Sequence, residues 1–571
     1  MRTVAVTYAY DADGHLTSVA DATGTRTLSY DADGSLISVA GPGSGSFAYD
    51  YAPDEESLTS RTYPDGTTLT YGHNSAEQIR FEADGSAQTT YTYDAAGNLT
   101  ATVLPDGITE ARTYNGDGQL TGITDTDGGA TLDSYALTLN ADGQPAEAAI
   151  TQDGTAQAPW YYNYDTDGRL TGACQTSAAP ATCSTSAGGA ETAWTYDQAG
   201  NMLTQASGGT TTSYAYNADE QITQAVTGNS TVSYGYDADG NLTTAGASTY
   251  AYNGAGELSQ AVTAAGTSSY TYDAAGNLSA TSLNGTPQQD TIWDVNNPLP
   301  LPAEQTSAPG APTTDLTYNP NATLNAMTTP AGTDNATTDW LGSVTGLVNS
   351  SGTQISSTIY TPQGTPATTG VPASPIGYAG SYNLPGTGGL DDMNARDYNP
   401  ATGTFTSTDP LLAVTGQPYI YADDSPAAET DPSGECSGWL VCGIINDVVN
   451  GAKLLGSLAK YWYDTSCGGP ESAGIFVTTP RGVTYQIPSG WVAREADNGK
   501  GIVFQQSGAS GNADSIRIMD PTARYPNGYA IVSNSEGQSV DNLGSAGNPL
   551  GRAATHLPED DLGDFPDLPI L

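Results

Sequence analysis

The feature that most constrains this chain is a repeat of the form Tyr-x-Tyr-Asp/Asn-x-x-Gly-x-Leu-Thr. Within one copy the two tyrosines alternate with another residue, which is the two-residue period of a β-strand. The Asp-x-x-Gly part predicts a turn, because aspartate bonds backbone amides and glycine accepts positive φ. Each copy therefore predicts one β-hairpin. The second tyrosine of the clear copies is Tyr10, Tyr93, Tyr164, Tyr196, Tyr216, Tyr236, Tyr252 and Tyr272.

The copies follow one another at a near-constant spacing, with Tyr196, Tyr216 and Tyr236 each 20 residues apart. A single hairpin is marginally stable in water and needs neighbours. Hairpins stacked at this period predict one continuous antiparallel sheet, which the right-handed twist of its strands curls into a spiral. Residues 1–285 are therefore expected to form a mainly β repeat domain.

The charge of the chain is strongly acidic and unevenly distributed. Net charge is −47, and residues 1–434 hold 47 of the 62 acidic but only 7 of the 15 basic residues, a net charge of −40. A surface this acidic repels nucleic acid and anionic membranes, so neither is expected as a partner of the repeat region. Tyrosine (35) outnumbers phenylalanine (6), and this favours flat aromatic faces with polar edges.

Two Asp-Pro units, Asp409-Pro410 and Asp431-Pro432, stand 22 residues apart (431 − 409) at the end of the repeat region. Each unit alone is consistent with an ordinary turn. Two carboxylates held close share a proton, so that one can act as an acid while the other acts as a base. Arg396 would hold one carboxylate ionised or polarise a carbonyl.

The segment around these units resembles the RHS-repeat-associated core of bacterial RHS proteins and of the C components of insecticidal toxin complexes. The residues that carry the resemblance are Arg396, Tyr398, Pro400, Gly403, Phe405, Asp409-Pro410, Tyr419, Tyr421, Pro426 and Asp431-Pro432-x-Gly434, together with Asp339 to Val344, Tyr360-x-Pro362-x-Gly364 and Tyr378-x-Gly380 upstream. The hairpin repeat is similar to the YD shells of RHS proteins and teneurins.

The resemblance implies a hollow β-shell, or cocoon, closed by a core over residues 286–434. It also implies that the core cuts its own chain after Asp431-Pro432-Ser433-Gly434, with Arg396, Asp409 and Asp431 as the site, and frees the tail inside the shell. This sequence departs from the family pattern at Leu412, Asp424 and Glu435. An uncut structural plug is therefore the alternative.

The composition changes beyond Gly434. Apolar residues three or four apart over 439–462 predict an amphipathic helix within a linker at 435–470. Its polar residues make it too hydrophilic for a stable membrane span. Short β patterns at 475–478, 483–487, 501–506, 515–519 and 529–532 then predict a small α+β domain over 471–571.

The tail resembles a C-terminal module of bacterial polymorphic toxins in R-I-M-D-P-T-A-R-Y-P-N-G-Y, residues 517–529, and in Thr555-His556. The resemblance implies a released toxin used in competition between bacteria, with a cognate immunity protein as partner. A metal-independent ribonuclease needs a general acid or base and cations that stabilise the phosphate. The candidate residues are His556, Arg494, Lys500, Arg517 and Arg524; the alternative is that they are ordinary surface residues. No zinc-deaminase, HExxH or phosphate-loop signature occurs, so no cofactor or metal is expected.

Three functions remain open from the sequence. One is toxin delivery with RNA as the target of the tail. Another is a structural or adhesive surface protein whose tyrosine-rich faces bind carbohydrate. The third is a tail toxin with a target other than RNA, such as a membrane.

The expected location is secreted or at the cell surface. Cys174 and Cys183 bracket a short loop, and their pairing would indicate an oxidising compartment; the alternative is two unrelated small residues. The first residues enter the repeat at once, with no Sec signal. Export then uses another route, or the sequence begins inside a longer protein.

Overall fold

The computed structural model describes residues 7–20, 24–41, 46–53, 57–177, 180, 183, 190–297, 299–307, 311–366 and 374–435, and seven strands of the tail. The chain divides into two compact units, Met1–Gly438 and Trp439–Leu571. Among the described helices none is long and apolar enough to cross a membrane.

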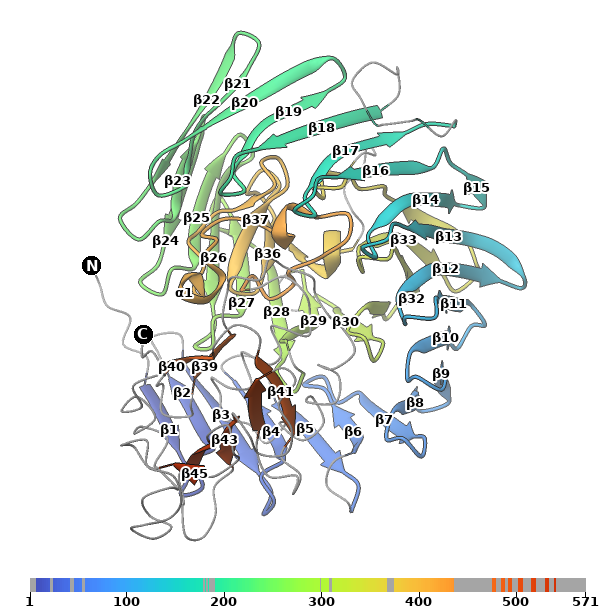
Figure 1. Ribbon diagram of the computed structural model, residues 1–571. Helices are drawn as coiled ribbons and strands as arrows, with labels where there is room; N and C mark the ends of the chain where they lie inside the picture. The colour runs from blue at the N-terminus through green and yellow to red at the C-terminus, as the bar shows by residue number, and fades with distance from the viewer. Residues whose placement is uncertain are drawn as a thin grey trace. The chain divides into compact units, whose positions relative to one another are not determined.

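The first unit is dominated by one sheet of 34 strands, nearly all paired with their neighbours in sequence and all antiparallel (Figure 1). Its first half comprises β1 (Thr7–Tyr10), β2 (Leu16–Ala20), β3 (Thr25–Tyr30), β4 (Leu36–Ala40), β5 (Ser46–Tyr51), β6 (Leu58–Thr62), β7 (Thr68–His73), β8 (Ile79–Asp84), β9 (Ala87–Tyr93), β10 (Leu99–Val103), β11 (Thr109–Tyr114), β12 (Leu120–Asp127), β13 (Ala130–Leu139), β14 (Pro145–Gln152), β15 (Thr155–Ala156), β16 (Trp160–Tyr164) and β17 (Leu170–Gln175).

The second half continues with β18 (Ala190–Tyr196), β19 (Met202–Ser207), β20 (Thr210–Tyr216), β21 (Ile222–Thr227), β22 (Ser230–Tyr236), β23 (Leu242–Ala245), β24 (Ser248–Tyr252), β25 (Leu258–Thr263), β26 (Gly266–Tyr272), β27 (Leu278–Leu283), β28 (Thr286–Asp294), β29 (Leu301–Thr306), β30 (Thr313–Tyr318), β31 (Leu324–Thr329), β32 (Gly332–Thr338), β33 (Val344–Asn349) and β34 (Gln354–Ser357). The sheet thus runs past residue 285, through a region that the sequence analysis places in the core segment.

The turns have the chemistry that the repeat predicts. Between β22 and β23 the amide of Asn241 donates to Oδ1 of Asp237 at 2.9 Å, and Gly240 has φ of +84°. In many of the hairpins the tyrosine that ends the first strand also bonds the preceding hairpin. The hydroxyl of Tyr216, for example, donates to the carbonyl oxygen of Met202 at 2.9 Å. Equivalent bonds join Tyr30 to Leu16, Tyr93 to Ile79 and Tyr114 to Leu99.

Curling of the sheet brings residues 26–106 against residues 273–335. Side-chain contacts link Arg26 with Asp273, Tyr49 with Asp294, Tyr91 with Asn325 and Asp106 with Asn335, separations of 247, 245, 234 and 229 residues. The number of residues between the two partners is nearly constant. Successive hairpins early in the sheet therefore lie against successive hairpins late in the sheet. We call this contact line the seam. The predicted spiral is therefore confirmed.

A core segment lies inside the curve of the sheet (Figure 1). Its small sheet comprises β35 (Tyr382–Asn383), β36 (Asp391–Met393), β37 (Arg396–Asn399) and β38 (Thr404–Phe405), accompanied by short helices η1 (Tyr378–Gly380), α1 (Leu412–Thr415) and η2 (Ala422–Asp424). Its aromatic residues Tyr378, Tyr398, Phe405 and Tyr421 pack together in one buried cluster. The hydroxyl of Tyr419 donates to the carbonyl oxygen of Gly240 at 2.9 Å, which anchors the core to the middle of the sheet.

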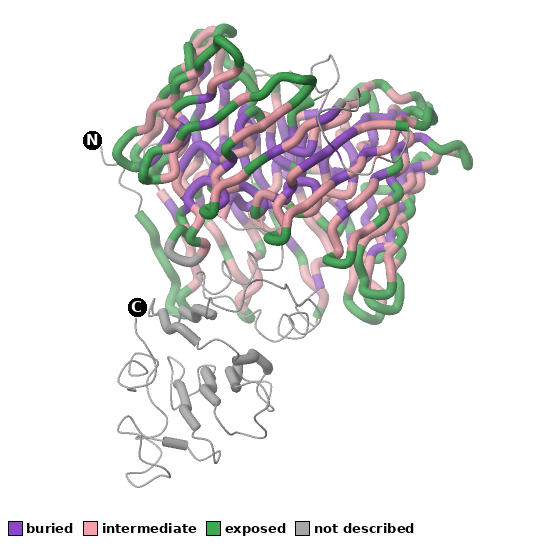
Figure 2. The backbone as a smooth tube through the Cα atoms, turned by 45° about the horizontal axis from the view of Figure 1, so that its top comes forward, coloured by how far each residue is buried: buried purple, intermediate pink, exposed green. Residues whose placement is uncertain are grey.

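Burial follows this arrangement. Buried residues concentrate in the middle strands and the core segment, whereas the hairpin turns are exposed (Figure 2). Cys174 and Cys183 form a disulfide, which settles the pairing that the sequence left open.

The second unit shows seven described strands. A hairpin pairs β39 (Ile475–Thr478) with β40 (Thr484–Ile487), and a five-stranded antiparallel sheet comprises β41 (Trp491–Glu495), β42 (Ile502–Gln506), β43 (Ser515–Met519), β44 (Tyr529–Ser533) and β45 (Ser539–Val540). All five predicted strands are present, and β41 and β45 were not predicted. The helix expected at 439–462 lies outside the described residues.

Candidate active site

The corner between β36 and β37 positions the central side chain. Asn394 and Ala395 form a two-residue turn in which Asn394 has φ of +61°. Asparagine tolerates this left-handed conformation better than most residues do. Arg396 follows at once and points into the core segment, where the residue is 3% exposed.

Arg396 brings together the residues predicted from sequence. Its Nη2 lies 3.3 Å from Oδ2 of Asp409 and 3.3 Å from Oδ2 of Asp431. Its guanidinium carbon lies 3.6 Å from the ring centre of Phe405, a cation–π contact. Burial lowers the pKa of Arg396, and the two carboxylates oppose that shift.

Asp409 is 5% exposed and is held by the turn that its Asp-Pro sequence predicts. Its Oδ1 accepts the amide of Leu411 at 2.6 Å, and its Oδ2 accepts the hydroxyl of Thr415 at 3.0 Å. Burial raises the pKa of Asp409, against the charge of Arg396 and these two donors. Asp409 is therefore a carboxyl that can take up a proton more readily than an ordinary aspartate.

Arg396 and Asp431 form hydrogen bonds with the carbonyl group and the amide group of one peptide bond. The carbonyl oxygen of Gly434 accepts a hydrogen bond from Nε of Arg396. The amide of Glu435 donates to Oδ1 of Asp431 at 3.2 Å, and Asp431 is 1% exposed. A cation on the carbonyl and a carboxylate on the nitrogen are the groups that hydrolysis of the Gly434–Glu435 bond would use.

The opposite face of β37 carries an acidic group that the sequence analysis did not single out. Asp397 stands directly opposite Asp392 of β36, and both side chains are buried. Burial raises the pKa of Asp392 to about 7, and that of Asp397 well above its ordinary value. Burial likewise raises the pKa of Asp391 to about 8. The sequence signal that could have identified this group is the presence of charged residues within short strand-like segments, L-D-D-M at residues 390–393 and R-D-Y at residues 396–398.

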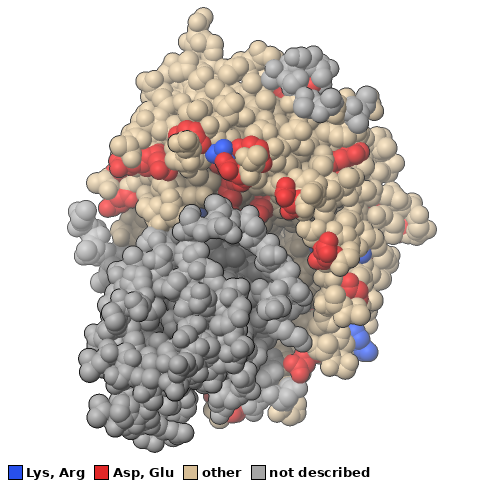
Figure 3. Space-filling view, viewed as in Figure 1, with Lys and Arg blue, Asp and Glu red and all other residues tan. Residues whose placement is uncertain are grey.

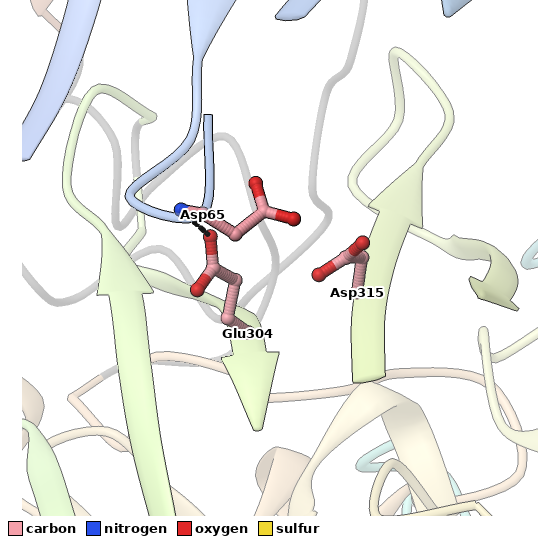
Figure 4. A group of neighbouring side chains, drawn as sticks. All are labelled: Asp65, Glu304 and Asp315. Atoms are coloured by element: carbon pink, nitrogen blue, oxygen red, sulfur yellow. Dashed lines mark hydrogen bonds between the residues drawn. The ribbon is translucent and has the colours of Figure 1, made fainter. Parts of the chain in front are cut away.

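A third acidic group lies on the seam. Asp65, from the turn between β6 and β7, meets Glu304 of β29 and Asp315 of β30, with carboxylate oxygens within 4.8 Å of one another (Figure 4). Burial raises the pKa of Glu304 to about 7 and that of Asp315 to about 6. Among the described residues this is the one carboxylate group close enough to surround a cation.

The predicted tail residues are only partly placed. Arg494 of β41 and Arg517 of β43 occupy one row of the sheet, because both pair with Val503 of β42. Lys500, Arg524 and His556 lie outside the described residues. Asp and Glu outnumber Lys and Arg on the visible described surface (Figure 3), as the composition predicts.

Two family models match the chain, the teneurin YD-shell over residues 146–421 and the RHS repeat over residues 10–51 and 79–109. No curated protein sequence matches it. The crystal structure of TcdB2-TccC3 is 16% identical with a TM-score of 0.59, and the match covers 76% of this chain and 26% of that chain. The Photorhabdus luminescens Tc holotoxin pore with a mutated TccC3 is 14% identical with a TM-score of 0.41, over 75% and 29% of the two chains. The chain thus spans 26% of the length of the TcdB2-TccC3 chain that it resembles in fold.

Proposed function

Because models of the teneurin YD-shell and of the RHS repeat match the chain, we propose that its core segment cuts the bond after Gly434 and so releases the following residues as a toxin. The observation that carries the proposal is that one peptide bond is hydrogen-bonded on both sides: Arg396 donates to the carbonyl oxygen of Gly434, and Asp431 accepts the amide of Glu435. A structural plug would not need a buried cation on that carbonyl.

The reaction would be hydrolysis. A water oxygen bonds to the carbonyl carbon of Gly434, and Arg396 stabilises the negative charge that develops on the carbonyl oxygen. In this step Asp431 must start in its protonated form. As the bond between the carbonyl carbon and the nitrogen of Glu435 breaks, that nitrogen keeps the electron pair, takes the proton of Asp431 and leaves as an amine, and Asp431 becomes a carboxylate. Asp409, the second carboxylate at Arg396, takes the proton of the attacking water. The products are a carboxylate at Gly434 and a new amino terminus at Glu435.

The test is the state of the purified full chain on a denaturing gel. Wild-type protein should yield two fragments, the smaller of 137 residues (571 − 434) and beginning at Glu435. Asp409→Asn and Asp431→Asn should each leave the chain whole, with unchanged circular dichroism. A wild-type chain that stays whole under all conditions would favour the uncut plug and a structural or adhesive role.

The released tail is proposed to act on RNA and to be enclosed by the shell until release, with a cognate immunity protein as antidote. Its support is that residues 435–571 hold 8 of the 15 basic residues and that the strand register places Arg494 and Arg517 in one row of the sheet. The Cys174–Cys183 disulfide fits a protein that is secreted or displayed at the cell surface.

Expression of the full chain in a bacterium tests the activity of the tail. Wild-type protein should arrest growth and degrade RNA, whereas His556→Ala should do neither, because loss of a general acid or base costs about 10²- to 10⁴-fold in rate. Arrest with intact RNA would indicate another target. Protease resistance of the tail in the uncut Asp409→Asn chain tests enclosure.

A further inference from the structure

Residues 394–396, at the corner between β36 and β37, donate hydrogen bonds to the three carbonyl groups of residues 432–434, just before the bond that would be cut. Nδ2 of Asn394 donates to the carbonyl oxygen of Pro432 at 2.9 Å. The amide of Ala395 donates to the carbonyl oxygen of Ser433 at 3.0 Å. Nε of Arg396 donates to the carbonyl oxygen of Gly434. The corner therefore binds the backbone of the segment, one residue after another.

We propose that Asn394 is a positioning residue for self-cleavage and that Gly434 determines which bond is cut. The inference rests on the proposed self-cleavage and assigns the binding half of the same site. The corner would then recognise the backbone of residues 432–434 and not their side chains.

The geometry of Asn394 favours a positioning role over a structural one. The residue is exposed, so no buried polar group requires its hydrogen bond to Pro432. Its φ of +61° costs folding free energy that glycine would not cost. Holding a reacting group in place is a large part of enzymatic rate acceleration, and a small displacement of that group is costly. The side chain of Asn394 fixes the carbonyl two residues before the one that reacts.

Gly434 fits where no other residue does. Its φ is +66°, and a Cβ added to it would lie 2.5 Å from the carbonyl oxygen of Met393 and 2.8 Å from the amide nitrogen of Arg396. Both neighbours are backbone atoms of the corner itself, so neither can move without moving Arg396. A side chain at position 434 would therefore push the carbonyl away from Nε of Arg396.

The first experiment measures the fraction of chain cut over time after a pulse of synthesis. Asn394→Gly keeps the left-handed backbone without strain and removes the donor, so cleavage should slow roughly five- to tenfold, the worth of one hydrogen bond, while the melting temperature stays level or rises. Asn394→Asp should be slow at neutral pH and approach the wild-type rate in acid, where its protonated carboxyl donates again. Wild-type rates for both variants at every pH would overturn the role of Asn394.

The second experiment compares two glycine substitutions. Gly434→Ala should abolish cleavage. Gly256→Ala is the matched control, because Gly256 has φ of +87° and a Cβ added there would have nothing within 4 Å, so it adds backbone strain without a collision. Both variants should fold, and the control should cut itself at the wild-type rate. Normal cutting of Gly434→Ala at the same bond would overturn the role of Gly434.

A third measurement separates failure of this inference from failure of the proposed function. In the Asp409→Asn chain, which should stay whole, amide hydrogen exchange over residues 431–435 reports docking of the segment without any cutting. Exchange should quicken when Asn394→Gly or Gly434→Ala is added. Unchanged exchange would overturn the inference even if the wild-type chain cuts itself. Faster exchange together with a wild-type chain that stays whole would show that the segment docks as described and would overturn the proposed self-cleavage instead.

Discussion

Arg396 makes contacts that no other side chain could make at once. Its Nε reaches the carbonyl oxygen of Gly434, and its Nη2 reaches both Asp409 and Asp431. This is the forked geometry of a guanidinium, whereas lysine offers one compact charge. The same side chain therefore holds the two carboxylates close together and also binds the carbonyl group of Gly434.

Arg396→Lys should leave the chain folded but slow self-cleavage about 10²-fold or more, the usual cost of removing a preorganised donor from a developing oxyanion. The fraction cut after a pulse of synthesis measures the effect. Arg61→Lys is the control, because Arg61 forms a buried ion pair with Asp294 at 3.0 Å on the seam. That variant should lose stability and still cut itself. Full cleavage by Arg396→Lys would contradict the role of the guanidinium.

The residues predicted for the core site were within reach of the sequence, and their partners were not. Arg396, Asp409 and Asp431 were assigned because they match positions of the RHS core that the segment resembles, and the structure brings all three together. Asn394 gave no such signal, since its role depends on the φ of one corner residue and on the carbonyl that happens to face it. Asp392 and Asp397 were missed because only the register of β36 and β37 places them opposite each other.

At the scale of elements, the hairpin is predictable where the Tyr-x-Tyr repeat is uninterrupted. The Asp-x-x-Gly turn and the tyrosine before it were both recognised from local chemistry. Later hairpins use other residues at the glycine position, such as Ala322 with φ of +59° between β30 and β31. Loss of the glycine alone does not hide a hairpin, because the copy at Tyr216 was recognised although Glu220, with φ of +61°, stands at its glycine position. The strands after residue 285 were not expected because the prolines between residues 298 and 312 interrupt the Tyr-x-Tyr repeat.

Ala322→Gly should raise the free energy of unfolding by about 0.5–1 kcal/mol, because alanine is strained in the left-handed region and glycine is not. Gly256→Ala makes the reverse change at an equivalent turn and should lower it by about 1 kcal/mol. Urea denaturation of the Asp409→Asn chain followed by circular dichroism measures both. Equal midpoints for the three chains would show that these turns are not strained.

At the scale of the whole first unit, the sequence could not predict which early hairpin of the sheet meets which late hairpin along the seam. This pairing depends on twist accumulated over many strands, so a small difference per strand would bring other hairpins together. The contacts of the seam are consequently specific pairs, such as Arg26 with Asp273 and Tyr49 with Asp294, scattered through copies that otherwise look alike. The seam is where a change in one side chain should alter the closure of the sheet.

The acidic group on the seam should make the stability of the first unit depend on pH. Glu304, Asp315 and Asp65 face one another, and Asp84 adds its charge to that around Asp315. Burial and neighbouring carboxylates raise the pKa of Glu304 to about 7, above its value of 4.5 in the unfolded chain. The folded state thus holds a proton that the unfolded state has lost. The stability that Glu304 contributes is full below pH 4.5 and is lost as pH rises through about 7.

Glu304→Gln should therefore raise the melting temperature of the Asp409→Asn chain at pH 8 and change it little at pH 4.5. Glutamine keeps the oxygen that accepts the amide of Asp65 at 3.1 Å, so the substitution removes the charge and leaves the hydrogen bond. Asp239→Asn, at an exposed hairpin turn, is the control and should leave the pH dependence unchanged. Calorimetry from pH 4.5 to pH 8 measures the three chains. A melting temperature for Glu304→Gln that falls below that of its parent at pH 8 would show that the carboxylate stabilises the seam when ionised.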